Sequence, residues 1–182
     1  TDQPPAKRTS APQPAQPTTS KGRVQSFQPN FNSETRSEIK PKSNVQLRNK
    51  IKRLEWDDKF STGDQTIDNQ HRKLFQMINQ FGDDIIGGTW PQTTEKTLKF
   101  LGEYVQSHFQ HEEKCMVEKK CPVAEKNVVA HKAFIDAFVG FNNRIQDEGA
   151  SEEIVVELHQ TATQWLVKHI CGIDVHLKHC VG

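Results

Sequence analysis

Four stretches of the chain repeat a spacing of three or four residues, and this periodicity limits the possible folds more than any other feature. The first series is Ile67, His71, Leu74, Ile78, Phe81 and Ile85. The next three are Leu98, Leu101, Val105, His108, Glu112 and Cys115; Asn127, His131, Phe134, Phe138, Phe141 and Ile145; and Val155, Leu158, Ala162, Trp165 and His169. Such spacing puts each series on the buried face of an α-helix. The pattern predicts an all-α fold.

Helix-breaking residues separate the four stretches, at positions 87–91, 121–122 and 149–151. Short connections of this kind are typical of an up-down-up-down antiparallel four-helix bundle. Ser151 is expected to cap the start of the fourth helix. Residues 54–66 have no clear period, and we predict that they form an N-terminal arm packed on the bundle through Trp56 and Phe60.

Residues 1–53 differ in composition from the rest. They hold seven of the nine prolines, and eleven Lys and Arg against three Asp and Glu, a net charge of +8. Residues 54–182 carry a net charge of −7. We predict a disordered Pro/Gln-rich basic linker over 1–53 and the bundle over 54–182. The overall charge of +1 is therefore a cancellation and says little about nucleic acid. We interpret the basic stretch as a solvated linker and expect no nucleic-acid partner.

The sequence lacks the signals of membrane insertion or secretion. No apolar run approaches the ~18 residues of a membrane span, and no signal peptide is visible. Four cysteines without a secretory signal suggest a reducing compartment. We therefore expect a cytoplasmic protein, with no membrane contact by this segment.

Polar residues occupy the buried stripes of all four helices. They are His71, His108, Glu112, Asn127, His131 and His169. Burying an unpaired polar group costs about 2–7 kcal/mol. One core histidine is usually a hydrogen-bonded structural residue, but a contribution from every helix favours a cation that all of them coordinate. Antiparallel helices bring these positions to the same end of the bundle.

The type of ligand narrows the choice of metal. A mixed imidazole and carboxylate set, without cysteine on most stripes, suits iron or manganese. The set is also too large for one four-coordinate zinc ion. Two metal ions bridged by carboxylates would use it in full.

Five segments, in this order, resemble the hemerythrin family. They are WDDKFSTG at 56–63, IDNQHRKL at 67–74, HFQHEEKCM at 108–116, HKAF at 131–134 and WLVKHICGID at 165–174. The resemblance implies two non-haem iron ions with an oxo or hydroxo bridge. It also implies that His71 and His108 ligate the iron that binds dioxygen, and that His131 and His169 ligate the other. The implied bridging carboxylates are Glu112 and Asp174.

The resemblance further implies that Phe109, Trp165 and Leu166 wall a dioxygen pocket. Asp174 fits this scheme less well by periodicity, because it lies about 140° round an ideal helix from His169. We expect Gly172 to let the last turn of the helix deform, which would bring the carboxylate inward.

Asn127 departs from the family pattern, in which the third helix carries two ligand histidines four residues apart. Asn127 can coordinate iron weakly through its amide oxygen, hydrogen-bond a coordinated water, leave an open position or simply fill space. We favour a water-filled position, since an amide is a poor ligand for ferric iron. Reversible oxygen storage would then be impaired, and chemistry with peroxide would be favoured.

The functions that follow fall into three classes. The preferred one is a dioxygen-binding domain that acts as an oxygen or redox sensor in signal transduction, and not an enzyme. Hemerythrin-like domains occur at the C-terminus of bacterial chemoreceptors, so the linker favours an upstream signalling module and a role in chemotaxis. The alternative is a di-iron peroxidase or oxidase that uses peroxide or dioxygen. A bundle without metal is disfavoured by the surviving ligands.

Two further positions carry expectations of their own. Cys115 faces the seam near the metal ligands, either as a small core residue or as a redox partner of Cys121. His159 lies one position off its helical stripe, which predicts an exposed side chain.

Overall fold

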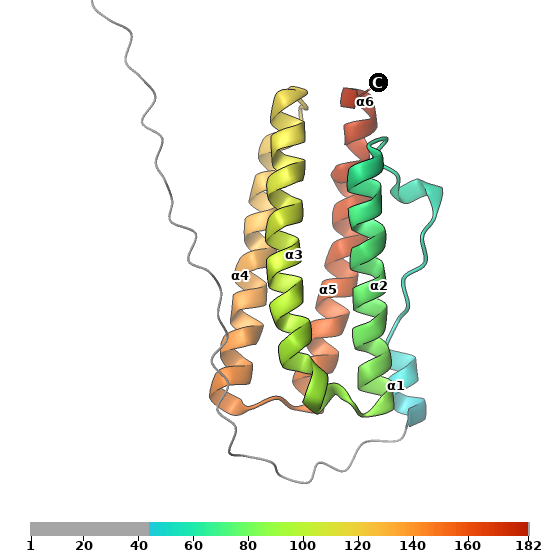
Figure 1. Ribbon diagram of the computed structural model, residues 1–182, viewed down its shortest axis with the longest axis vertical. Helices are drawn as coiled ribbons and strands as arrows, with labels where there is room; N and C mark the ends of the chain where they lie inside the picture. The colour runs from blue at the N-terminus through green and yellow to red at the C-terminus, as the bar shows by residue number, and fades with distance from the viewer. Residues whose placement is uncertain (1–43, 182) are drawn as a thin grey trace, which may run out of the picture.

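The computed structural model describes residues 44–181, and its main body is a ring of four long helices. They are α2 (Gln65–Gly87), α3 (Trp90–Glu118), α4 (Ala124–Glu148) and α5 (Glu152–Gly172). Helices α2 and α4 each pack against both α3 and α5, and consecutive helices run antiparallel (Figure 1). The predicted all-α up-down-up-down bundle is confirmed.

The ends of these helices follow from local side-chain chemistry. The Asp64 carboxylate accepts from the backbone N–H groups of Thr66 and Ile67 and so caps the start of α2. Gly88 ends this helix with φ of 76°, a conformation that glycine adopts without steric cost. Ser151 accepts from the N–H of Ile154 at 3.2 Å, which confirms the predicted cap of α5.

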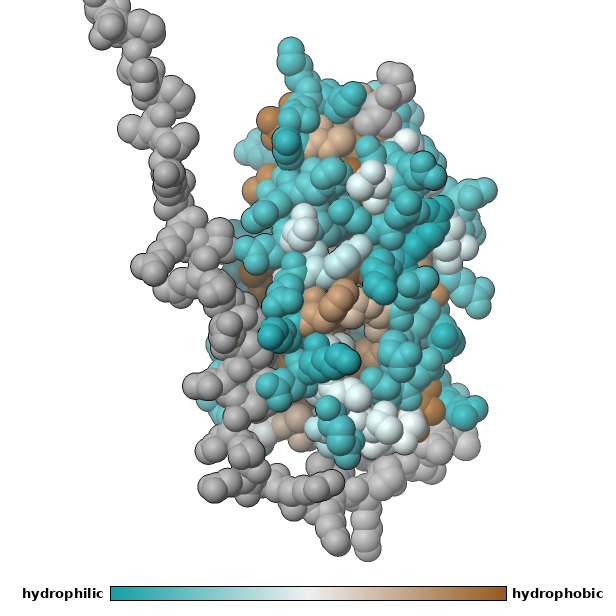
Figure 2. All heavy atoms as spheres, in the orientation of Figure 1, coloured by the Kyte–Doolittle hydropathy of each residue, from teal (hydrophilic) through white to brown (hydrophobic). Residues whose placement is uncertain are grey.

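The core consists of the apolar stripes predicted from the periodicity. Most of the buried apolar side chains from the four helices form one continuous cluster. The face seen in Figure 2 is mostly hydrophilic, with hydrophobic side chains confined to small patches. Among the described helices, none combines the length and hydropathy needed to cross a bilayer.

A short helix, α1 (Asn44–Lys50), packs on α2 ahead of the bundle. Leu47, Ile51 and Leu54 are buried in the main core. The packed part of the chain thus includes residues 44–53, which we assigned to the linker. Their apolar positions share one helical face, but basic residues surround them and dominate the composition. The rest of the predicted linker, residues 1–43, lies outside the described residues.

The segment before α2 runs along the outside of the bundle beside α2 (Figure 1). This arm contains one turn of 3₁₀ helix, η1 (Asp58–Phe60). The Trp56 and Phe60 rings pack against Phe75 of α2, with ring centroids 6.0 and 5.1 Å away. The Arg72 guanidinium lies 4.1 Å from the centroid of the Trp56 ring. Asn79 holds the arm by accepting from the N–H and donating to the carbonyl of Leu54. The arm therefore packs on the bundle as the sequence indicated.

After α5 the chain ends in two short elements at the same end of the bundle. These are η2 (Asp174–Leu177), a 3₁₀ turn, and α6 (Lys178–Val181). Figure 1 shows α6 beside the beginning of α2 and the end of α3.

His159 of α5 is buried, with only 1% of its surface exposed, so the prediction that it is exposed is wrong. Helix α5 packs against both α2 and α4, and it therefore buries more than one stripe. The His159 ring lies close to Gly82 of α2, where a Cβ atom would come within 2.9 Å of Nε2. Burial lowers the pKa of His159 to about 4.

Acid is expected to destabilise the protein partly through His159. The unfolded chain gains the proton near the ordinary pKa of 6.5, whereas the folded chain resists it down to about 4. The folded state therefore loses about 3 kcal/mol from this residue as pH falls from 6.5 to 4, and almost nothing above 6.5. Urea unfolding at pH 7 and pH 4.5 is expected to show a smaller loss for His159→Leu than for the parent. Equal losses would contradict this assignment.

Candidate metal centre

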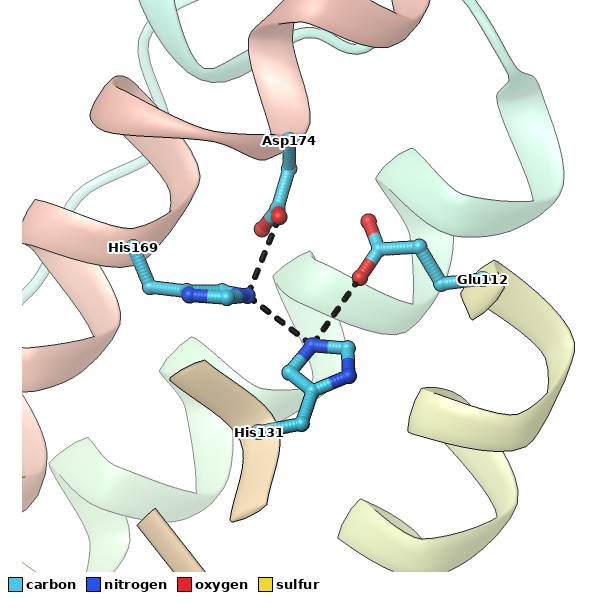
Figure 3. Close-up of side chains that lie close together, drawn as sticks. All are labelled: Glu112, His131, His169 and Asp174. Atoms are coloured by element: carbon cyan, nitrogen blue, oxygen red, sulfur yellow. Dashed lines mark hydrogen bonds and ion pairs between the residues drawn. The ribbon is translucent and has the colours of Figure 1, made fainter. Parts of the chain in front are cut away.

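Six side chains from five elements meet inside one end of the bundle. They are His71 of α2, His108 and Glu112 of α3, His131 of α4, His169 of α5 and Asp174 of η2. All are buried, with exposed fractions between 0% and 4%. The structure thus brings together the six residues that the sequence singled out as ligands. Figure 3 shows four of them pointing toward one another.

The two carboxylates each lie between two sets of imidazoles. Glu112 has Oε1 4.0 Å from Nε2 of His71 and Oε2 3.3 Å from Nε2 of His131. Asp174 has Oδ2 3.5 Å from Nε2 of His71 and Oδ1 3.0 Å from Nε2 of His169. Each carboxylate therefore offers one oxygen to each set, which suits a pair of cations bridged by carboxylates.

The six residues form two overlapping groups, each with ligand atoms close enough together to hold a metal ion. His71, His108 and Glu112 make one, and Glu112, His131, His169 and Asp174 make the other. Within each group, the ligand atoms lie within 4.8 Å of one another. Glu112 belongs to both groups, so the arrangement contains two candidate cation positions with a shared ligand.

Asp174 reaches the centre because the helix that carries His169 stops before it. Helix α5 ends at Gly172, and Ile173 leaves the helical conformation with φ of −133° and ψ of −61°. Its N–H still donates to the His169 carbonyl at 2.8 Å, and η2 begins at the next residue. This break brings the Asp174 carboxylate inward as expected, but it falls at Ile173, and Gly172 itself remains in the helix.

Two neighbouring side chains fix the tautomers of the histidines. Nδ1 of His108 donates to Oε1 of Gln70 at 2.9 Å, and Nδ1 of His131 donates to Oε1 of Glu113 at 2.8 Å. Since both acceptors are oxygens, the protons lie on Nδ1 and the Nε2 lone pairs are left for a metal. We did not predict Gln70 as a site residue. Gln70 directly precedes His71 in the sequence, and this adjacency was the signal that could have indicated its role at the site.

The hydrogen bonding of the centre is incomplete without a cation. Both ring nitrogens of His71, Oε1 of Glu112 and both oxygens of Asp174 are buried without a hydrogen-bond partner among the described residues. Nε2 of His131 and Nε2 of His169 lie 2.9 Å apart. Buried polar atoms are normally paired, so these atoms fit a site built to coordinate metal.

Burial also shifts the titration of these groups. It holds the pKa values of His108, His131 and His169 at about 4, and that of His71 well below its ordinary range. The imidazoles are therefore neutral, the form that binds metal. Burial, reinforced by Asp174, raises the pKa of Glu112 to about 7, and burial raises that of Asp174 to about 8. A bound cation would supply the positive charge that favours the ionised form of these two carboxylates.

Asn127 of α4 lies at the centre, on the side of His131. It is fully buried, and its Nδ2 donates to Oε2 of Glu112 at 3.4 Å. Its Oδ1 has no hydrogen-bond partner among the described residues. This placement puts an amide beside the Glu112 carboxylate, with an oxygen that meets no donor from the described residues.

Aromatic rings cover one side of the centre. Phe109 stacks on the His131 ring with centroids 3.5 Å apart, and Trp165 stacks on the His169 ring at 4.2 Å. Together with Leu166, these side chains line an almost wholly apolar cavity of about 20 Å³ between the four helices. The three predicted pocket residues therefore share one cavity, large enough for a single small molecule.

The cysteines do not pair as the sequence suggested. Cys121 forms a disulfide with Cys180 of α6, with Cα atoms 5.6 Å apart, and Cys115 is a free, half-buried thiol. A redox pair of Cys115 and Cys121 is therefore not what the structure contains. The reason is that Cys121 lies beyond the end of α3, in a turn that faces the C-terminal helix.

Comparisons with known proteins agree with this geometry. The model of a family described as "Hemerythrin HHE cation binding domain" matches residues 62–179. The chain is 32% identical over 121 residues to a bacteriohemerythrin of Pseudomonas aeruginosa, covering 66% of this chain and 76% of that protein. It is 27% identical over 124 residues to a myohemerythrin of Theromyzon tessulatum, covering 68% and 90%. No solved structure matches the chain.

Proposed function

The chain belongs to the hemerythrin family, and on this premise we propose that its metal centre holds two non-haem iron ions and binds dioxygen. His71 and His108 would hold one iron, and His131 and His169 the other. Glu112 and Asp174 would bridge the two. The observation that carries this proposal is that each carboxylate offers one oxygen to each set of imidazoles. We also propose an oxo or hydroxo bridge between the two irons.

The side chains around the centre favour a small apolar ligand. Iron supplies the reversible change of oxidation state that dioxygen binding requires. Phe109, Trp165 and Leu166 present apolar surface to the cavity, which excludes water and stray protons. Gln70 and Glu113 hold two of the histidines in the tautomer that coordinates metal. The protein's contribution is thus to hold the ions, orient the ligands and keep the cavity dry.

Anaerobic reduction followed by addition of dioxygen tests the proposal. We expect two irons per chain and an absorption change that appears with dioxygen and reverses under vacuum. Metal analysis and absorption spectra over several cycles provide the readouts. A chain that retains no iron after purification and reconstitution would overturn the proposal, as would iron that shows no spectral response to dioxygen.

Asn127 favours a second candidate function, a di-iron enzyme that reacts with peroxide or dioxygen. Its amide oxygen has no hydrogen-bond partner among the described residues, and the side chain is shorter than the imidazole of the family pattern. We propose that a water occupies the remaining space. Exogenous ligands could then reach both ions. Turnover of peroxide with an electron donor would support this function over storage or sensing.

Replacing Asn127 with histidine is expected to lengthen the lifetime of the oxygenated form by about tenfold. The added imidazole would complete the ligand set on the side of His131 and close the position to water. Decay of the oxygenated spectrum in Asn127→His and in the parent measures the effect. Asn143→His, an identical change on the exposed face of α4, serves as the control. Equal lifetimes in Asn127→His and the parent would contradict this role of Asn127.

We also propose that the domain acts as an oxygen or redox sensor joined to an upstream signalling module. The basic, proline-rich composition of residues 1–53 supports this context. Expression of the domain with and without its natural upstream sequence, with a signalling output measured under air and under argon, tests it. An output that ignores dioxygen would contradict the sensor role.

A further inference from the structure

The Cys121–Cys180 disulfide lies outside the metal centre but at the same end of the bundle. Cys121 follows α3 in the turn that leads to α4, and Cys180 belongs to α6. In Figure 1, α6 lies at the end where α3 stops and α2 begins. The bond therefore ties residues 173–181, which we call the C-terminal segment, to the opposite side of the bundle.

The C-terminal segment packs on the bundle through a small set of apolar side chains. A small cluster, separate from the main core, lies under the disulfide and consists of Ile67, Met116, Cys121, Ile173 and Leu177. The C-terminal segment supplies the buried Ile173 and Leu177 to it and packs Cys180 against it, while Val175 packs against the main core. Terminal elements with little buried surface open at low free energy. The disulfide adds a covalent link between this short terminal segment and the turn after α3.

The C-terminal segment also carries one of the carboxylates of the metal centre. Asp174 lies between the helix break at Ile173 and the disulfide at Cys180. Its oxygens lie 3.0 Å from Nε2 of His169 and 3.5 Å from Nε2 of His71. No hydrogen bond fixes this carboxylate within the described residues. Its position thus depends on the backbone of the segment that holds it.

We propose that the Cys121–Cys180 disulfide is a site of thiol–disulfide exchange with dithiol reductants, and that its reduction frees the C-terminal segment and speeds metal release. The first half of this inference is that exchange opens the disulfide and frees the C-terminal segment, and it stands on the placement of the disulfide alone. The second half is that metal is then released faster. It rests on the proposed function, because it requires Asp174 to hold metal.

The exchange has a defined direction of attack. Cys180 is half-buried, whereas Cys121 is only 5% exposed. A thiolate of the reductant attacks Sγ of Cys180, and Cys121 leaves as a thiolate. The second thiol of the reductant then attacks the mixed disulfide and releases Cys180. Two electrons and two protons pass to the cysteines, which become thiols, while the dithiol is oxidised to its own disulfide.

Hydrogen exchange of the metal-free protein tests the first half. After treatment with dithiothreitol, amides of the C-terminal segment are expected to exchange at least tenfold faster, with little change in the four long helices. The double variant Cys121→Ser, Cys180→Ser is expected to behave in the same way without reductant. Cys171→Ser, which removes an exposed free thiol and keeps the disulfide, serves as the control. Unchanged exchange on reduction, or four free thiols in air-oxidised protein by mass spectrometry, would overturn the inference.

Iron release tests the second half. Protein loaded anaerobically with ferrous iron is reduced, freed of dithiothreitol by desalting and mixed with a ferrous chelator. We expect release at least tenfold faster than from the oxidised protein. Equal release despite faster amide exchange would overturn the link to the metal. A chain that binds no iron would count against the proposed function, and the exchange experiment would still decide whether the disulfide holds the segment.

Discussion

Replacing Glu112 with glutamine is expected to weaken the binding of both metal ions, by at least about 100-fold. Glu112 belongs to both groups of candidate ligands and offers one oxygen to each. The amide removes the charge and leaves one weak oxygen donor, so the two ions no longer share a charged ligand. Metal analysis after equilibrium dialysis, together with competition against a chelator, measures the loss.

Two neighbouring glutamates provide matched controls for this variant. Glu113→Gln removes only the charge of the group that accepts from His131 and is expected to weaken binding by up to about tenfold. Glu118→Gln changes an exposed side chain at the end of α3 and is expected to have no effect. Loss of one ion with retention of the other in Glu112→Gln would contradict a shared role for this carboxylate.

Removing the metal is expected to lower the free energy of unfolding by at least about 4 kcal/mol. A ligand that binds only the folded chain stabilises it, and the metal-free centre buries ligand atoms of His71, Glu112 and Asp174 without partners. Urea unfolding of the metal-loaded and chelator-treated protein measures the difference. Equal midpoints would show that the centre binds metal too weakly to matter for folding.

The metal-free state permits a stricter version of the same experiment. Glu112→Leu replaces a buried carboxyl with an apolar group of similar size, so it is expected to make the metal-free protein more stable than the metal-free parent. The same variant is expected to gain nothing from added metal. A less stable metal-free variant would contradict the conclusion that this carboxyl is unfavourable without its ion.

Most of the fold was accessible from the sequence because a bundle is built from local patterns. The spacing of three and four residues fixes which face of each helix is buried, and short connections fix the antiparallel order. His159 shows where this reasoning fails. A single stripe per helix is too simple for α5, which packs on two neighbouring helices and buries a second face.

The residues of the candidate centre could be predicted from the sequence where their positions follow from regular helix geometry. His71, His108 and His131 lie on regular helical stripes, so periodicity alone indicates that they are buried. Asp174 does not, because its position follows from a break in the helix at Ile173. Only the resemblance to the hemerythrin family pointed to it.

The disulfide and the packing of α1 lay beyond reach of pattern analysis. Cys121 and Cys180 are 59 residues apart, and nothing in the spacing of either cysteine indicates that the turn after α3 faces the C-terminal helix. Leu47 and Ile51 form an apolar series that is too short to distinguish a packed helix from a basic linker. Both features depend on tertiary contacts, which propensity and periodicity do not encode.

The position of α1 limits how the metal centre can influence anything joined to the chain ahead of it. Ile51, which follows α1, approaches Gly82 of α2, eleven residues from His71 and therefore about 16 Å along the helix axis. A rearrangement confined to the ligand side chains would not by itself move the part of α2 that contacts Ile51. Under the proposed sensor role, a signal from the metal centre would have to reach α1 as a rigid shift or rotation of α2 or α5.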